Sequence, residues 1–214
     1  MKTNVFLILS LFVAQFIFGQ QTIDTIALKK EYTNLENALK EAEKVFRLNL
    51  SDQNINIPSL TWLKFKNLEY LSLKNDHLKE IPREISFLSN LKKLDLSGND
   101  FKILPIEFAD MKNLTEIYLN NERNLNLPAT LEILSNITSL KLLHLENDNI
   151  SRLPKIIENF KNLEYLYLND NKLKEIPKEL KGLDHLQYLD LNNNQLKTNT
   201  IAPKNLNFGF KIHF

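Results

Sequence analysis

The chain has 214 residues, of which 43% are hydrophobic and 25% are charged, with 27 basic and 26 acidic side chains. This composition is typical of a folded protein and argues against an intrinsically disordered one. The chain contains no cysteine, so disulfides, a cysteine nucleophile and a lipidated cysteine anchor are excluded.

Residues 1–19 have the pattern of a secretory signal peptide, because Lys2 precedes an apolar run over residues 5–18 that ends at the small residue Gly19. The alternative is a membrane anchor, but the run is short for a spanning helix and contains polar residues. We predict cleavage before Gln20, no integral membrane segment afterwards, and export to the periplasm, the cell surface or the medium. Cleavage removes one basic residue and leaves 26 basic and 26 acidic side chains. Neutrality argues against nucleic acid or an anionic membrane surface as the main partner.

Residues 20–44 are predicted to form an N-terminal leader and a capping helix. Residues 20–31 have no regular pattern and are expected to be irregular. Thr33 and Glu36 have the spacing of a capping box, with Thr33 as the N-cap residue. An apolar stripe follows at helical spacing, which predicts a helix over residues 34–43 that covers the exposed core of the next segment.

Residues 45–206 consist of one repeated unit. Its starts are Val45, Leu68, Leu91, Leu114, Leu140, Leu163 and Leu186. The starts are 23 residues apart, except for a spacing of 26 between Leu114 and Leu140. A fixed period in the twenties predicts a solenoid, in which each repeat packs on its neighbours.

Each repeat combines a strand pattern with a helical turn. Apolar residues stand three and five places after the start, as at Leu71 and Leu73, so they predict a short strand with both side chains inward. An apolar residue and a proline follow, as in Ile81-Pro82, and proline cannot donate to a sheet, so the chain turns away there. Apolar residues three apart, such as Ile85 and Leu88, suit a helical or 3₁₀ turn that packs back on the strand.

The pattern L-x-x-L-x-L-x-x-N-x-L-x-x-I-P resembles the leucine-rich repeat, in the short form of Ras-suppressor-type and many bacterial proteins. The resemblance implies an α/β fold: a right-handed solenoid shaped as a horseshoe, here of seven repeats. It implies a parallel sheet on the concave face and short helical turns on the convex face. It also implies binding, usually of protein, without catalysis.

The family's asparagine, eight places after the start, is implied to hydrogen-bond the backbone of adjacent turns. Asn99, Asn171 and Asn194 keep it, whereas Gln53, Asp76, Glu122 and Asp148 replace it. A carboxylate accepts hydrogen bonds but does not donate them, so we expect an incomplete ladder and looser turns at the three carboxylates.

Three irregular segments carry separate expectations. Three extra residues after Pro128 predict one additional helical turn on the convex side, with a functional protrusion as the alternative. Trp62 occupies a core position and is expected to be buried rather than to form a ligand platform. Residues 207–214 alternate apolar and polar side chains, which predicts a capping strand. Its apolar members are expected to pack under the last repeat: Phe208, Phe210, Ile212 and Phe214.

The candidate binding site is the concave face, where residues two and four places after each start point outward. Five of the six tyrosines lie there. Tyrosine offers a large contact area and a hydroxyl for little loss of side-chain entropy, so it is favoured at binding surfaces; the alternative, that tyrosine simply suits a strand, stays open. The predicted ligand-binding residues are Tyr70, Tyr118, His144, Tyr165, Tyr167, Tyr188 and Asp190. Basic residues (Arg47, Lys74 and Lys93) precede acidic ones along this face, and such a gradient would orient a partner.

Nothing in the sequence indicates catalysis, a cofactor or a metal site. The chain has four glycines and no glycine-rich phosphate loop, and its four histidines lack metal-ligand spacing and are expected at the surface. We therefore predict an exported, non-catalytic and monomeric protein that binds a protein or peptide, with a glycan ligand or a purely structural role as alternatives. The absence of the cysteine caps found in many secreted eukaryotic relatives favours a bacterial origin.

Overall fold

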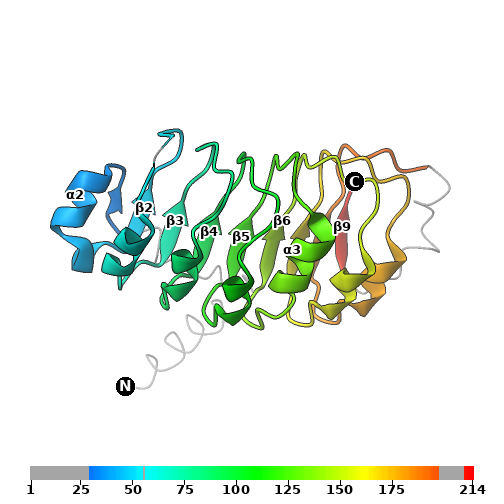
Figure 1. Ribbon diagram of the computed structural model, residues 1–214. Helices are drawn as coiled ribbons and strands as arrows, with labels where there is room; N and C mark the ends of the chain where they lie inside the picture. The colour runs from blue at the N-terminus through cyan, green and yellow to red at the C-terminus, as the bar shows by residue number, and fades with distance from the viewer. Residues whose placement is uncertain (1–28, 55, 198–209) are drawn as a thin grey trace, which may run out of the picture.

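The computed structural model describes residues 29–54, 56–197 and 210–214. Expectations for residues 1–19, Ile55 and Phe208 fall outside these ranges. The described strands form one uncurled parallel sheet of nine strands that follow one another in sequence order (Figure 1). They are β1 Glu31–Tyr32, β2 Arg47–Asn49, β3 Tyr70–Ser72, β4 Lys93–Asp95, β5 Glu116–Tyr118, β6 Leu142–His144, β7 Tyr165–Tyr167, β8 Tyr188–Asp190 and β9 Lys211–His213.

The predicted register is confirmed, because equivalent residues of successive repeats pair directly. Leu71 of β3 pairs with Leu94 of β4, which in turn pairs with Ile117 of β5. The middle residue of every strand from β2 to β8 is fully buried. Stacked leucine and isoleucine side chains therefore form one continuous core along the solenoid.

The helical turns of the repeats lie on one side of the row of strands, and α2 lies at the N-terminal end of the row (Figure 1). The helical elements are α2 Leu35–Lys40, η2 Ala42–Lys44, η3 Ser59–Lys64, η4 Arg83–Phe87, η5 Ile106–Asp110, α3 Leu127–Leu134, η6 Lys155–Asn159 and η7 Lys178–Gly182. The α-helix α3, eight residues long, stands where the neighbouring repeats have a 3₁₀ turn, so the extra residues after Pro128 lengthen this turn as expected. Trp62 is buried in the core, also as expected.

The predicted asparagine ladder is present, and it continues through the carboxylates. We call Asp76, Asn99, Glu122, Asp148, Asn171 and Asn194 the loop ladder. Asn99 donates to the carbonyl oxygens of Leu73 and Leu96 and accepts the backbone N–H of Leu78. Glu122 accepts the N–H of Asn99 at 2.9 Å, so a carboxylate supplies the acceptor half of the same pattern.

A second ladder follows the rim of the sheet, one residue before the loop ladder. All seven repeats have a left-handed residue there: Asp52, Asn75, Gly98, Asn121, Asn147, Asp170 and Asn193. Asparagine, aspartate and glycine tolerate this conformation better than other residues. Their side chains bond to one another across repeats, for example Asn193 to Asp170 at 2.8 Å. A Cβ at Gly98 would lie 2.0 Å from Asn75 Oδ1, so this glycine makes room for its neighbour.

The N-terminal cap differs from the prediction in three ways. Glu31 is not irregular, because it forms β1 together with Tyr32 and pairs with β2. Asn34, not Thr33, is the N-cap of α2, and its side chain accepts the N–H of Asn37 at 3.0 Å. The α-helix ends at Lys40 and a 3₁₀ turn follows, so the helix is shorter than residues 34–43.

The C-terminal strand β9 extends the sheet beyond β8, with Ile212 opposite Leu189. Phe210 and Ile212 pack against the core. The expectation for Phe214 is wrong, because 41% of its surface is exposed. It follows His213, the last residue of β9 that pairs with β8.

Candidate functional site

The predicted concave surface is the open face of the uncurled sheet, and we call it the sheet face. Its centre is a stack of three rings from three successive strands. Tyr118 and His144 stack with centroids 3.9 Å apart, and His144 and Tyr167 stack at 4.2 Å. These residues end β5, β6 and β7 at the same register position, so the strand spacing of about 4.8 Å brings their rings into contact.

Two further tyrosines extend the stack towards the C-terminus. The ring of Tyr188 lies 5.6 Å from that of Tyr167 and 6.3 Å from that of Tyr165, in tilted orientations. The Tyr188 hydroxyl donates to Asp190 at 3.4 Å. The structure thus brings six of the seven predicted site residues together in one aromatic cluster: Tyr118, His144, Tyr165, Tyr167, Tyr188 and Asp190.

Tyr70 does not belong to this cluster. It lies on β3, near the other end of the sheet, where Arg47 lies over its ring with the guanidinium carbon 4.6 Å from the centroid. Arg47 also forms an ion pair with Glu31. The predicted basic end of the sheet face is therefore partly neutralised by a residue of β1.

His144 is buried rather than at the surface, which corrects the expectation for this histidine. Its ring lies between two carboxylates: Nδ1 is 3.3 Å from Glu146 Oε1, and Nε2 is 3.3 Å from Glu116 Oε1. The Nε2 contact lacks the alignment of a hydrogen bond and is one of charge. Burial alone would lower the pKa of His144, but the two carboxylates raise it above the usual value.

Glu116 holds the centre of this network. It accepts a 2.5 Å hydrogen bond from the Tyr118 hydroxyl and pairs with Lys93 at 3.1 Å. Burial would raise the pKa of Glu116, but its contact with His144, the hydrogen bond from Tyr118 and the charge of Lys93 lower this pKa to about 2. The ionised carboxylate of Glu116 therefore accepts the hydroxyl of Tyr118 and lies against the ring of His144, and these contacts order the stack.

Sequence reasoning missed four participants in this site: Glu116, Glu146, Lys211 and His213. Glu116 and Glu146 lie in the outward columns, and aligning the columns of neighbouring repeats would have placed them beside His144. Lys211 and His213 come from β9, whose Lys211 Nζ is 5.9 Å from the centre of the Tyr188 ring. His213 Nδ1 lies 3.6 Å from Asp190, so the capping strand also contributes to the sheet face.

Neither a metal-binding cluster nor a helix able to span a membrane occurs among the described residues. Nowhere in these ranges do three or more histidine or acidic side chains gather in a metal-binding arrangement. Among the described helices, none combines the length and apolar character of a membrane span. What the cluster offers is an ordered, mainly aromatic surface with carboxylates beside it.

The family model for the leucine rich repeat matches residues 66–125 and 135–196, which is more than half of the chain. The protein therefore belongs to the leucine-rich repeat family. This family and fold are typically non-catalytic binding scaffolds. No curated protein matches the chain.

Several solved structures share the fold. A Toll–Spatzle complex from Drosophila matches at 20% identity with a TM-score of 0.65, over 77% of this chain and 22% of that chain. A leucine-rich repeat protein of Leptospira interrogans matches at 29% identity and 0.51, over 78% and 54%. A plant peptide hormone receptor, RGFR1, in complex with RGF2 matches at 30% identity and 0.51, over 70% and 24%. The chain thus spans about half the length of these proteins or less.

Proposed function

We propose that the protein binds a protein or peptide partner on the sheet face, through the aromatic cluster around His144. The observation that carries the proposal is the preformed stack of Tyr118, His144 and Tyr167, in which His144 lies between the carboxylates of Glu116 and Glu146. A rigid aromatic surface loses little entropy on binding, so its contact area converts efficiently into affinity. The likeness to a Toll–Spatzle complex and to a peptide hormone receptor with its ligand supports the same class of function.

A glycan ligand is less well supported. Sugars bind aromatic residues through open ring faces, whereas the rings of Tyr118, His144 and Tyr167 stack on one another. Both faces of the His144 ring are covered by tyrosines. The stack of these three rings therefore offers mainly ring edges, hydroxyls and carboxylates, which suits a polypeptide with apolar and hydrogen-bonding groups.

The organisation of the whole chain is part of this proposal. We propose an exported protein with residues 1–19 as a signal peptide, residues 20–44 as an N-terminal cap, a repeat domain over 45–206 and a capping strand over 207–214. Export would leave the sheet face accessible to partners outside the cell. The N-terminal sequence of secreted material tests the proposal for export, and retention of residues 1–19 would contradict it.

Binding can be tested with a paired comparison on the same face. The partner would be captured from a native envelope extract with a photo-crosslinking amino acid at position 167. We expect Tyr165→Ala with Tyr167→Ala to weaken its binding by about 30-fold or more, as loss of aromatic hot spots does. Tyr70→Ala is the matched control, because it removes a tyrosine of the sheet face outside the cluster.

Circular dichroism and melting curves should stay near the wild type in both variants, since these side chains point away from the core. If the captured partner binds the double variant with unchanged affinity, the aromatic cluster is not the binding site. If Tyr70→Ala weakens binding as strongly, the site extends over the whole sheet face and is not centred on His144.

A further inference from the structure

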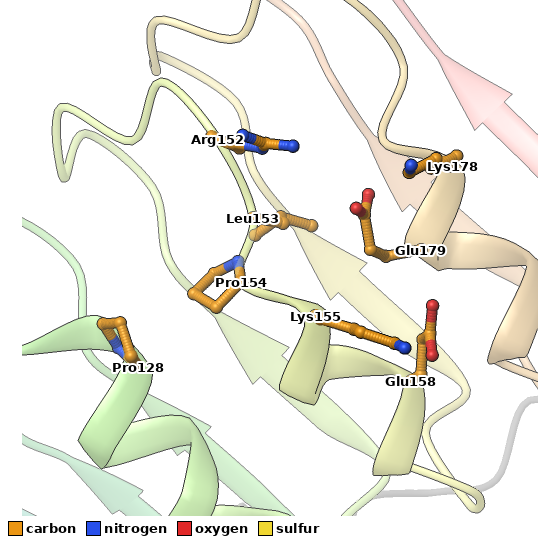
Figure 2. A pocket seen from close by; sticks show the side chains of 8 residues that line it. All are labelled: Pro128, Arg152, Leu153, Pro154, Lys155, Glu158, Lys178 and Glu179. Atoms are coloured by element: carbon orange, nitrogen blue, oxygen red, sulfur yellow. The ribbon is translucent and has the colours of Figure 1, made fainter.

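A second candidate site lies away from the sheet face, on the side of the helical turns. A cavity of about 650 Å³ opens between α3, η6 and η7 (Figure 2). Pro128, Leu153 and Pro154 give it an apolar wall. The cavity contains none of the residues of the aromatic cluster, so a ligand here would be independent of the proposed function.

Three basic side chains surround this cavity without an acidic partner. Arg152, Lys155 and Lys178 are exposed and line it together with Glu158 and Glu179. Among the described residues, none of the three basic groups forms an ion pair. In Figure 2 Arg152 and Lys178 extend above the carboxylate of Glu179, and Lys155 lies beside Glu158 at the lower end.

Glu179 is the unusual member of the group. Only 9% of its surface is exposed, yet within the described ranges its carboxylate has no hydrogen-bond or ion-pair partner. In Figure 2 this carboxylate points between the side chains of Arg152 and Lys178. The carboxylate oxygens are not among the buried atoms of the protein, so they remain open to the cavity and can accept N–H groups of a ligand.

In two earlier repeats the glutamate at the position equivalent to Glu179 has a basic partner. Glu84 and Glu107 also stand two places after the proline of their repeats, and both contact Arg83, at 3.6 and 3.8 Å. In those repeats the glutamate is therefore already paired with an arginine of the protein itself. In the repeat of Glu179 the basic and acidic groups remain separate.

The cavity continues into a second one of about 480 Å³. The two share Arg152, Leu153, Lys178 and Glu179, and the second extends past Leu173 to Ile176. Together they form one elongated cleft, which we call the edge cleft. Its length across two repeats suits an extended chain better than a compact ligand.

We propose that the edge cleft binds an extended peptide segment that carries one acidic side chain next to an apolar residue. The carboxylate would lie against Arg152 and Lys178, the apolar side chain would pack on Leu153 and the neighbouring prolines, and backbone N–H groups would donate to Glu179. Charge favours a carboxylate over a phosphate. The first cavity has three basic and two acidic lining residues, a net of +1 that matches a monoanion, and its carboxylates would repel a dianion.

The test uses the full chain and defined probes in a titration followed by ligand-observed nuclear magnetic resonance. The probes are N-acetyl-Leu-Glu-Leu-amide, the same peptide with glutamine in place of glutamate, and inorganic phosphate. We expect saturable binding of the glutamate peptide, and about tenfold weaker binding of the glutamine peptide, since a charge-assisted contact is lost. Arg152→Gln with Lys178→Gln should weaken binding of the glutamate peptide by a similar factor.

The chain offers a matched control in an equivalent groove of about 770 Å³ near β3 and β4, where Lys79 and Lys102 are offset by Glu80 and Asp100. Lys79→Gln with Lys102→Gln should leave binding of the glutamate peptide unchanged, and so should Tyr165→Ala with Tyr167→Ala. The proposal is overturned by the absence of saturable binding, by equal affinity for the glutamine peptide, or by an unaffected Arg152 and Lys178 double variant. Phosphate binding as tight as that of the glutamate peptide would also overturn it.

Discussion

Two adjacent turns of the loop ladder meet the same structural need with different side chains. Asn171 accepts the N–H groups of Asp148 and Ile150 at 3.1 and 2.9 Å and donates to the carbonyl oxygens of Leu145 and Leu168. Asp148, one repeat earlier, accepts the N–H of Glu122 at 2.7 Å, but its second oxygen is buried without a partner. Both side chains therefore accept backbone N–H groups, whereas only the amide of asparagine also donates to backbone carbonyl oxygens.

Protonation can restore the missing donor. Burial is the main cause that raises the pKa of Glu122 and of Asp148, each to about 8, and the charge of Asp148 adds to the effect on Glu122. Once protonated, such a carboxyl group has an O–H and can donate to a carbonyl oxygen as the amide does. The difference between the two turns is thus one that pH can change.

The direction of the pH dependence of stability follows from the linkage between proton binding and folding. Both carboxyl groups bind their proton more tightly in the folded chain than in the unfolded one, where the ordinary pKa values apply. Their contribution to stability is therefore complete below pH about 4 and is lost as pH rises through about 8. The turns with asparagine have no such dependence.

The largest effect is expected from removing an amide of the ladder. Asn171→Ala would leave the buried N–H of Ile150 and the carbonyl oxygen of Leu145 without a partner. We expect it to lower the free energy of unfolding by roughly 2–4 kcal/mol, as loss of several buried hydrogen bonds does. Denaturant titration measures this change.

Lys172→Ala is the control for this experiment, since its exposed side chain lies next in the sequence. It should change the free energy of unfolding by less than about 0.5 kcal/mol. Equal effects of the two substitutions would show that the ladder contributes nothing beyond the backbone contacts.

A smaller effect with the opposite sign is expected from restoring the amide. Asp148→Asn gives this turn the side chain of its neighbour, so it should raise the melting temperature at pH 9 by about 3 °C and change it little at pH 5. Melting curves across this range measure the difference. The raised pKa of His144 gives a dependence of the same sign, but it is present in both proteins and cancels in the comparison.

Asp184→Asn, at an exposed position, is the matched control and should give the same shift at both pH values. If Asp148→Asn gains as much at pH 5 as at pH 9, then ionisation of Asp148 is not what distinguishes the two turns.

The ladder also marks how far the sequence predicts this structure. Period and spacing were enough to place every strand from β2 to β8 and to identify the asparagines, because each repeat buries the same positions against its neighbours. The strand β1 was missed because Glu31 and Tyr32 precede the first repeat and are too few to show a period. The raised pKa values of Glu122 and Asp148 depend on burial depth and on the neighbouring acid, which a single repeat does not reveal.

The aromatic cluster and the edge cleft were also predictable only as far as the register of the repeats determines them. The tyrosines were predictable from the outward columns, since register alone brings Tyr118 and Tyr167 against His144. The burial of His144 between Glu116 and Glu146 depends on the stacking of three rings in space. The edge cleft had no signal in the sequence, because it arises from the unpaired state of Arg152 and Glu179 rather than from their identity.

The smallest effect is expected at Asp76, the first acidic residue of the ladder. Asp76 accepts the N–H groups of Gln53 and Asn54 at 2.8 and 2.9 Å. Burial raises its pKa, while these two bonds favour the charged form and limit the rise. Asp76→Asn should therefore raise the melting temperature at pH 9 by only about 1 °C, less than Asp148→Asn does. A gain at Asp76 larger than that at Asp148, in the same melting experiment, would mean that backbone N–H groups do not hold the charge of a buried ladder carboxylate. The difference in pH dependence between turns with an asparagine and turns with a carboxylate would then depend on burial alone.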